Sequence, residues 1–386
     1  MYHFHSVQLR AVRKHVRHHK KLLSGAEIIM LEHVLPTTLE FVRHLTDANI
    51  KVSKFIGKPY SVDAPTLEEL KGLCDVDVLP DYEGVETTTI LDDVIKAAAE
   101  KISGIGAKLI ILDVGGYFCE PLIRLSGTDF EHNLIAGVVE DTTFGHNRYV
   151  AAADKIKYPI YSVARSELKT IEARFVGRDA VMAMDMTLRK RGISISGRKA
   201  LVLGYGMIGS NVARSLKAAD LMVSVYDTFD HRNLQAFIDG FHIHKKRELI
   251  KEADIIFSAT ASCALDYSEI EECRSNVILC SVGSKDTEFD VKSIKNQSLG
   301  MNIIDDNLKE YKLPNSRSVI VAKEGTAVNF ILPSTPNEVL DLVFAEIVAA
   351  FVELLSKGKK TTGVVNYISA VKLSEIAKDW LVPMNQ

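Results

Sequence analysis

Three glycines, Gly204, Gly206 and Gly209, have the spacing G-x-G-x-x-G between an apolar run and a helix-forming run. Gly204 allows a sharp turn after the strand, Gly206 lets a pyrophosphate approach the backbone, and Gly209 lets the helix pack closely on the strand. The unpaired N–H groups of Met207 and Ile208 at the start of the helix would bind the phosphates. The spacing and its context predict a dinucleotide site.

The acid that follows the next apolar run belongs to the same fingerprint. Asp227 follows the run 221–226, about 20 residues after the glycines. Its carboxylate would accept hydrogen bonds from ribose hydroxyls and repel a 2′-phosphate, which favours NAD over NADP. Thr260 and Gly283 are small residues after two later strands, where bulk would block a cofactor. A nucleotide-free domain that keeps the turn for packing is the alternative.

A second group of ionisable residues follows apolar runs nearer the N-terminus. His33, Asp113 and Asp141 each stand after or at the end of such a run, and Lys169 opens a long amphipathic helix. Ligands of parallel sheets bind at the carboxyl ends of the strands, so these residues are our candidates for proton transfer. Each has a structural alternative. His33 can pack under a loop, Asp113 can cap a glycine turn, Asp141 can start a helix, and Lys169 can be a solvated first-turn lysine.

Strands and helices alternate through the chain, which predicts an α/β fold with two Rossmann-like domains, parallel sheets and long joining helices. One early strand is expected at 50–56, ended by residues 57–59. We expect five segments: a basic, His-rich segment at 1–21, a substrate-type domain at 22–168, a linking helix at 169–197, an NAD-binding domain at 198–330, and C-terminal helices at 331–386 that return to the first domain or form a subunit interface.

The composition of the 386-residue chain excludes several classes of partner. The 50 acidic and 47 basic residues give a net charge of −3, which offers no attraction for nucleic acid. We find no apolar run long enough to span a bilayer and no secretory signal. Five cysteines without a C-x-x-C pair indicate a reducing cytoplasm, and we expect no metal site. The expected partners are a small-molecule substrate and further copies of the chain, as a dimer or tetramer.

In the order of its motifs, the chain resembles the S-adenosylhomocysteine hydrolase (adenosylhomocysteinase) family over most of residues 22–355. Leu112-Asp-Val-Gly-Gly-Tyr117 resembles the family's Asp-Asp-Gly-Gly-Asp loop. Glu140-Asp-Thr-Thr-Phe-Gly-His146 resembles Glu-Glu-Thr-Thr-Thr-Gly, and Val202–Gly209 resembles Ala-Gly-Tyr-Gly-Asp-Val-Gly. The resemblance implies that Thr142 and Thr143 touch the cofactor.

The same resemblance implies roles for three further residues. His33 and Thr38 match the family's substrate-site His and Thr, and Asn329, in Ala-Val-Asn-Phe, matches an Asn that contacts the nicotinamide. The implied chemistry uses tightly held NAD, which takes a hydride from the ribose 3′-carbon. The adjacent proton then becomes acidic, a thiol is eliminated, water adds, and the hydride returns. Such chemistry needs protein bases and an acid.

Several positions depart from the family pattern. Val114 and Tyr117 stand where the Asp-Asp-Gly-Gly-Asp loop has acids, and Ser284 and Thr335 stand where the family has histidines. Lys169 could replace the family's lysine, although its register is off by about two. We therefore expect an NAD-dependent enzyme that oxidises a hydroxyl of a nucleoside-like or other small metabolite. An inactive NAD-binding sensor or assembly protein, and a genuine hydrolase with altered residues, remain open.

Overall fold

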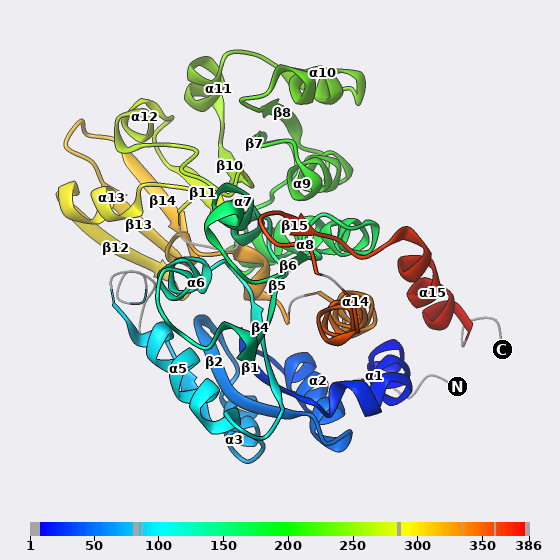
Figure 1. Cartoon of the computed structure of the whole chain (residues 1–386). Helices are drawn as coiled ribbons and strands as arrows, with labels where there is room; N and C mark the ends of the chain where they lie inside the picture. The colour runs from blue at the N-terminus through cyan, green and yellow to red at the C-terminus, as the bar shows by residue number, and fades with distance from the viewer. Residues whose placement is uncertain are drawn as a thin grey trace. The chain divides into compact units, whose positions relative to one another are not determined.

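The structure is a computed structural model that describes residues 8–79, 85, 88–283, 287–333, 335–358 and 360–382. It divides into two compact units (Figure 1). The first comprises Met1–Lys169 and Asn337–Gln386, and the second comprises Thr170–Pro336. We describe each unit by itself.

The first unit is built on a seven-stranded sheet in the order β15-β6-β5-β4-β1-β2-β3, and all paired neighbours are parallel. Its strands are β1 (Ala26–Val34), β2 (Lys51–Val62), β3 (Val76–Val78), β4 (Lys108–Asp113), β5 (Ile135–Glu140), β6 (Ile160–Ser162) and β15 (Val365–Asn366). Its helices are α1 (Arg10–Leu23), α2 (Pro36–Asp47), α3 (Ala64–Lys71), α5 (Ile90–Ile102), α6 (Cys119–Ser126), α7 (Thr143–Ala152), α14 (Asn337–Leu355) and α15 (Ala370–Leu381).

Alternation of apolar side chains along the central strands divides the core of this unit into two layers. In β1, Ile28 and Met30 face a cluster formed with α1, α2, α14 and α15, whereas Ile29 and Leu31 face a cluster formed with α5, α6 and α7. Both faces of the sheet are thus covered by helices, as parallel sheets require. Because the faces are covered, the carboxyl ends of the strands are the place where a ligand-binding site is expected.

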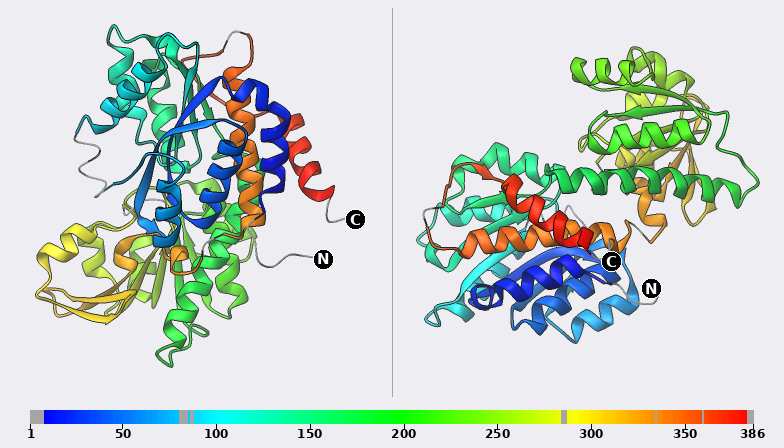
Figure 2. Two further views of the ribbon diagram at one scale, coloured as in Figure 1. Left: turned by 90° about the horizontal axis from the view of Figure 1, so that it is seen from below. Right: turned by 90° about the vertical axis from the view of Figure 1, so that its right-hand side faces the viewer.

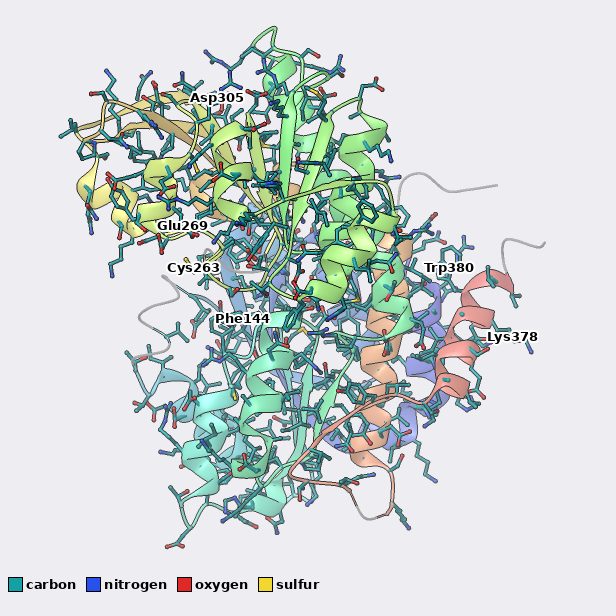
Figure 3. The ribbon with its side chains drawn as sticks, turned by 90° about the horizontal axis from the view of Figure 1, so that it is seen from above. Phe144, Cys263, Glu269, Asp305, Lys378 and Trp380 are labelled. Carbon is teal, nitrogen blue, oxygen red and sulfur yellow. The ribbon has the colours of Figure 1, made fainter. Side chains whose placement is uncertain are left out.

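Helix α14 is the long apolar helix of the C-terminal region, and it lies beside α1 and α15 (Figure 2). The Asp341 carboxylate of α14 accepts hydrogen bonds from the backbone N–H groups of Ala11 and Val12, both at 2.9 Å. It thereby caps the first turn of α1, whose own N-cap side chain makes no such bond. Trp380 of α15 donates its indole N–H to the carbonyl of Glu338 (Figure 3).

The second unit is built on an eight-stranded sheet in the order β12-β13-β14-β11-β10-β7-β8-β9. Its strands are β7 (Lys199–Leu203), β8 (Met222–Tyr226), β9 (His242–Ile243), β10 (Ile255–Ser258), β11 (Val277–Ser281), β12 (Gly300–Asp305), β13 (Leu308–Lys312) and β14 (Ser318–Ala322). Its helices are α9 (Met207–Ala218), α10 (Asp230–Ile238), α11 (Lys246–Glu252), α12 (Tyr267–Glu272) and α13 (Val291–Gln297), and most of α8 (Glu167–Arg189) also belongs to it.

The predicted α/β class with two Rossmann-like sheets is confirmed. In the first unit six strands follow the order β3-β2-β1-β4-β5-β6, and in the second β9-β8-β7-β10-β11-β14, which is the same classic order 3-2-1-4-5-6. The second sheet adds β12 and β13, which pair antiparallel at its edge. In such sheets the ligand crevice lies where the strand order reverses. This point falls between β1 and β4 in one unit and between β7 and β10 in the other.

One boundary differs from the expectation. We expected the second strand to end at 57–59, but β2 continues to Val62. Gly57 still pairs with Glu32 of β1, and the register then shifts before Val62 pairs with Val34. Pro59 lies within this irregular stretch, so its missing N–H interrupts no regular ladder. The continuation carries Lys58 and Ser61 to the carboxyl edge of the sheet.

Within the described residues of the chain, we find no helix whose length and apolar character would let it cross a bilayer.

Candidate functional site

At the carboxyl edge of the first sheet, two buried carboxylates hold the loops that follow β4 and β5. Glu140 accepts hydrogen bonds from the backbone N–H groups of Gly115 and Gly116, at 3.1 and 2.9 Å, and from the N–H and hydroxyl of Thr142. Burial raises the pKa of Glu140 well above its usual value. Gly145 leaves room for this carboxylate, because a Cβ there would come within 2.2 Å of it.

Asp113 has a similar role on the neighbouring strand, β4. Its oxygens accept hydrogen bonds from the N–H groups of Tyr117 and Phe118, at 3.1 and 2.9 Å, and from the hydroxyl of Tyr149 at 2.7 Å. The side chain is fully buried, and burial raises its pKa to about 6. These bonds are similar to the structural alternative that we gave for Asp113, the capping of a glycine turn. Its catalytic role stays a prediction.

Asp141 and Lys169 form an ion pair at the same edge, 2.9 Å apart, with side chains that are 10% and 15% exposed. Asp141 follows β5, and Lys169 lies in the first turn of α8. The Ser166 hydroxyl accepts a hydrogen bond from the N–H of Lys169 and donates one to Glu346 of α14. Two of the four predicted catalytic residues are thus in direct contact, and their catalytic roles stay predictions.

His33 lies at the end of β1, where its Nδ1 hydrogen-bonds the hydroxyl of Ser61 from β2. The ring is half-buried and packs edge-on against Tyr60, with ring centroids 5.5 Å apart. Thr38 is buried in α2. His146, in α7, hydrogen-bonds Ser162 at 3.0 Å. His33 therefore remains a candidate at the mouth of the sheet.

Sequence reasoning missed three buried ionisable residues here. Glu32 precedes His33 in β1, and burial together with the charge of Asp141 raises its pKa to about 7. Burial and the same charge raise the pKa of Glu346 to about 8. Burial lowers the pKa of the Lys58 ammonium. Little in the sequence distinguishes them, because each lies in an element that carries other charged residues as well.

Lys58 is the most unusual member of this group. It is fully buried, and its ammonium has no hydrogen-bond partner among the residues that the structure describes. The nitrogen lies 5.9 Å from the ring centroid of Tyr60 and 5.8 Å from that of Tyr117. The charges of Glu32 and Glu140 act on it and favour its protonated form. The edge of the first sheet therefore holds several carboxyl groups and two amines.

In the second unit, the predicted dinucleotide turn has the required shape. Gly204 has φ +89°, and a Cβ there would lie 2.7 Å from the Ala259 carbonyl oxygen. A Cβ on Gly209 would lie 1.9 Å from the Gly204 carbonyl oxygen, so this close approach of helix and strand requires glycine. Above Gly206 the space is open, because the nearest atom to a Cβ there would be 3.9 Å away. A pyrophosphate can therefore approach this backbone.

Helix α9 starts at Met207, and its N-cap residue, Gly206, makes no side-chain cap. The N–H groups of Met207 and Ile208 thus point from a helix start that is open to phosphate. Asp227, at the end of β8, accepts a hydrogen bond at 2.7 Å from the N–H of Tyr205 in the turn. These features fit a bound NAD.

The wall beyond β10 and β11 is organised by Glu288, which sequence reasoning also missed. Its buried carboxylate accepts hydrogen bonds from the hydroxyl of Ser258, from the N–H and hydroxyl of Thr260 and from the N–H of Ala261. A Cβ on Gly283 would come within 2.3 Å of this carboxylate. Gly283 must therefore be a glycine because Glu288 fills the space beside it, and Thr260 is held by a hydrogen bond to the same carboxylate.

The remaining predicted cofactor residues are placed as follows. Asn329 is buried in a 3₁₀ turn at Val328–Ile331 of the second unit. Thr142 belongs to the first unit, where its hydroxyl accepts from the N–H of Gly145 and caps α7. Thr143 is half-buried and starts that helix, next to Phe144 (Figure 3). Their contacts with a cofactor stay predictions.

Of the positions that depart from the family pattern, three lie within the described structure. Val114 and Tyr117 are buried in the loop after β4, and Thr335 is buried just before α14. Ser284 lies outside the described residues. Among the residues that the structure describes, no group of three or more His, Cys, Asp or Glu side chains could hold a metal ion.

Comparison with known proteins gives matches to one family and to solved structures. The sequence model of the "S-adenosyl-L-homocysteine hydrolase, NAD binding domain" matches residues 175–334. The adenosylhomocysteinase of Sulfolobus acidocaldarius is 30% identical over 67% of this chain, which spans 62% of that protein's length. The adenosylhomocysteinase of Saccharolobus solfataricus is 28% identical over 92% of this chain and 83% of its own length. A dipicolinate synthase chain from Bacillus halodurans, a solved structure, covers 85% of this chain and 99% of its own, with a TM-score of 0.47 and 13% identity.

Proposed function

Because the chain belongs to the S-adenosyl-L-homocysteine hydrolase family, as a divergent member, we propose that it is an NAD-dependent enzyme that oxidises a hydroxyl group of a nucleoside-like or other small metabolite. The cofactor is NAD, held at the turn Gly204–Gly209. The observation that carries the proposal is the Asp141–Lys169 ion pair at the carboxyl edge of the first sheet.

Oxidation of a hydroxyl group releases a hydride, which NAD accepts when bound, and a proton, which a protein group must take. Lys169 is partly exposed and is oriented by Asp141, so its amine can hydrogen-bond a substrate oxygen. Glu32, with a pKa of about 7, can exchange a proton near neutral pH. His33, tied to Ser61, places an imidazole at the same edge.

The test is a set of nucleosides and related metabolites, with adenosylhomocysteine first, mixed with purified protein. We expect at least one compound to raise the absorbance of reduced nicotinamide at about 340 nm, or to exchange a carbon-bound hydrogen with solvent. Lys169→Met should abolish this signal, whereas Lys101→Met, at an exposed lysine of α5, should not. Adenosine released from adenosylhomocysteine at a rate ordinary for enzymes would instead favour a genuine hydrolase.

One observation favours a second candidate function, an inactive NAD-binding sensor or assembly protein. Both carboxylate oxygens of Asp113 already accept hydrogen bonds from Tyr117, Phe118 and Tyr149. The neighbouring residue, Val114, has no carboxyl group. The candidate predicts bound NAD that no metabolite reduces. We further propose that the protein acts in the cytoplasm and that it is a homo-oligomer. Light scattering would test the oligomeric state.

A further inference from the structure

Arg232, in the first turn of α10, lies beside the dinucleotide turn and was not among the predicted cofactor residues. Its Nη1 is 3.3 Å from Oδ2 of Asp227, and its guanidinium lies over the ring of Phe229, 5.1 Å from the centroid. The side chain is 33% exposed. The stacking and the ion pair hold the guanidinium in place while leaving a portion of it open to a ligand.

The acid that this arginine contacts already serves the protein itself. Asp227 is 3% exposed, and its two oxygens accept hydrogen bonds from the N–H groups of Tyr205 and Phe229, at 2.7 and 2.9 Å. The carboxylate thus connects the glycine turn to the residue that precedes helix α10. Its negative charge is shared with Arg232 and with these two N–H groups, so a bound ligand meets less than a full charge.

Arg232 also borders the space above Gly206. A Cβ placed on Gly206 would have Nη1 of Arg232 as its nearest neighbour, at 3.9 Å. The guanidinium is therefore close both to the phosphate-binding backbone at Gly206 and to Asp227, the acid expected at the adenosine ribose. In Rossmann domains an arginine near this position accommodates a 2′-phosphate, whereas a lone acid excludes one.

We propose that Arg232 is a specificity-determining residue of the cofactor site, where its pairing with Asp227 moderates the preference for NAD over NADP. Its planar fork is suited to a phosphate on the ribose and neutralises the repulsion that Asp227 alone would exert. The inference concerns the dinucleotide site alone and does not depend on the proposed substrate or on turnover.

The test measures dissociation constants of NAD and NADP by calorimetry, on protein freed of co-purified nucleotide. For the native chain we expect both to bind, NAD more tightly. Arg232→Ala should weaken NADP at least about tenfold more than NAD, since a hydrogen bond to a charged group is worth about that much. The NADP dissociation constant of Arg232→Lys should lie between those of the native chain and of Arg232→Ala. Arg247→Ala, at an exposed arginine paired with Glu272, is the control and should change neither constant.

Melting temperatures would reveal whether the alanine variant is unstable. If it is, Arg232→Gln replaces it in the test, because glutamine removes the charge and is closer in size to arginine. Equal weakening of NAD and NADP would overturn the proposal, because Arg232 would then act on the shared pyrophosphate or on the fold. Unchanged constants would overturn it as well.

Discussion

At the carboxyl edge of the first sheet, buried carboxylates accept hydrogen bonds from the loops. At the corresponding edge of the second sheet, buried Asp227 and Glu288 do the same, but a glycine turn beside them leaves backbone N–H groups open. The six central strands have the same order in both units, so both edges place their site where this order reverses. Glu140 illustrates the first edge and Gly206 the second. The same topology thus supports one site built from several buried charged groups and another that adds an open glycine turn to its buried carboxylates.

This difference determines how each site should respond to substitution and to pH. The glycine turn of the second site depends on van der Waals space, which pH does not alter. A site made by buried carboxyl groups depends on their protonation, because burial raises the pKa of Glu32 to about 7 and of Glu346 to about 8. The following variants test this contrast, in order of decreasing expected effect on stability.

Gly209→Ala should have the largest effect. Its Cβ would lie 1.9 Å from a backbone oxygen that cannot move aside, so α9 must shift away from β7. We expect a loss of at least about 3 kcal/mol in the free energy of unfolding, measured by urea denaturation, and loss of NAD binding. Native stability in this variant would contradict a site made by close backbone contact.

Glu140→Ala should be nearly as severe at the other edge. It leaves the N–H groups of Gly115, Gly116 and Thr142 without their acceptor in the core. Unpaired buried donors cost about 1–3 kcal/mol each, so we expect a total of about 3 kcal/mol in urea denaturation. Glu131→Ala, at an exposed acid, is the control and should change stability little.

Glu346→Gln should change the pH dependence of stability. The pKa of Glu346 is raised to about 8 in the folded chain, so its contribution is present below the unfolded value of 4.5 and is lost as pH rises towards 8. Native protein should therefore lose stability between these limits, and the glutamine variant should lose less. Parallel curves for the two proteins would show that Glu346 does not titrate in this window.

Gly206→Ala should have the smallest effect on stability. The nearest atom to its Cβ would be 3.9 Å away, and the residue has a negative φ, so the fold accepts a methyl group. The methyl group would stand in the path of the pyrophosphate, so NAD affinity should fall about tenfold or more. Unchanged affinity at an unchanged melting temperature would place the pyrophosphate elsewhere.

The backbone shape of the second site was easier to predict from the sequence than the contacts of the first, for a physical reason. Gly204, Gly206 and Gly209 are demanded by local backbone geometry, so their spacing is visible in the sequence. At the first edge, the rule for parallel strands placed His33 and Asp141 correctly at the ends of their strands, and Lys169 came to lie beside Asp141.

What the sequence could not provide is the convergence of charged residues from distant elements. Lys58 comes from an extension of β2 that Gly57 and Pro59 argued against, and Glu346 comes from an apolar helix that follows the whole second unit. Glu288 similarly acts on Thr260 across a loop. The contacts of these residues depend on tertiary packing, and no local sequence pattern indicates them.

The central claim, that this chain oxidises a hydroxyl with bound NAD, is tested most directly by a single-turnover measurement. Protein loaded with NAD is mixed with the nucleoside set, and absorbance at about 340 nm is followed. We expect at least one compound to reduce the bound cofactor, Lys169→Met to abolish this reduction, and Lys101→Met to preserve it. Bound NAD that no compound reduces, with carbon-bound hydrogens that never exchange, would contradict the claim and favour the inactive NAD-binding protein.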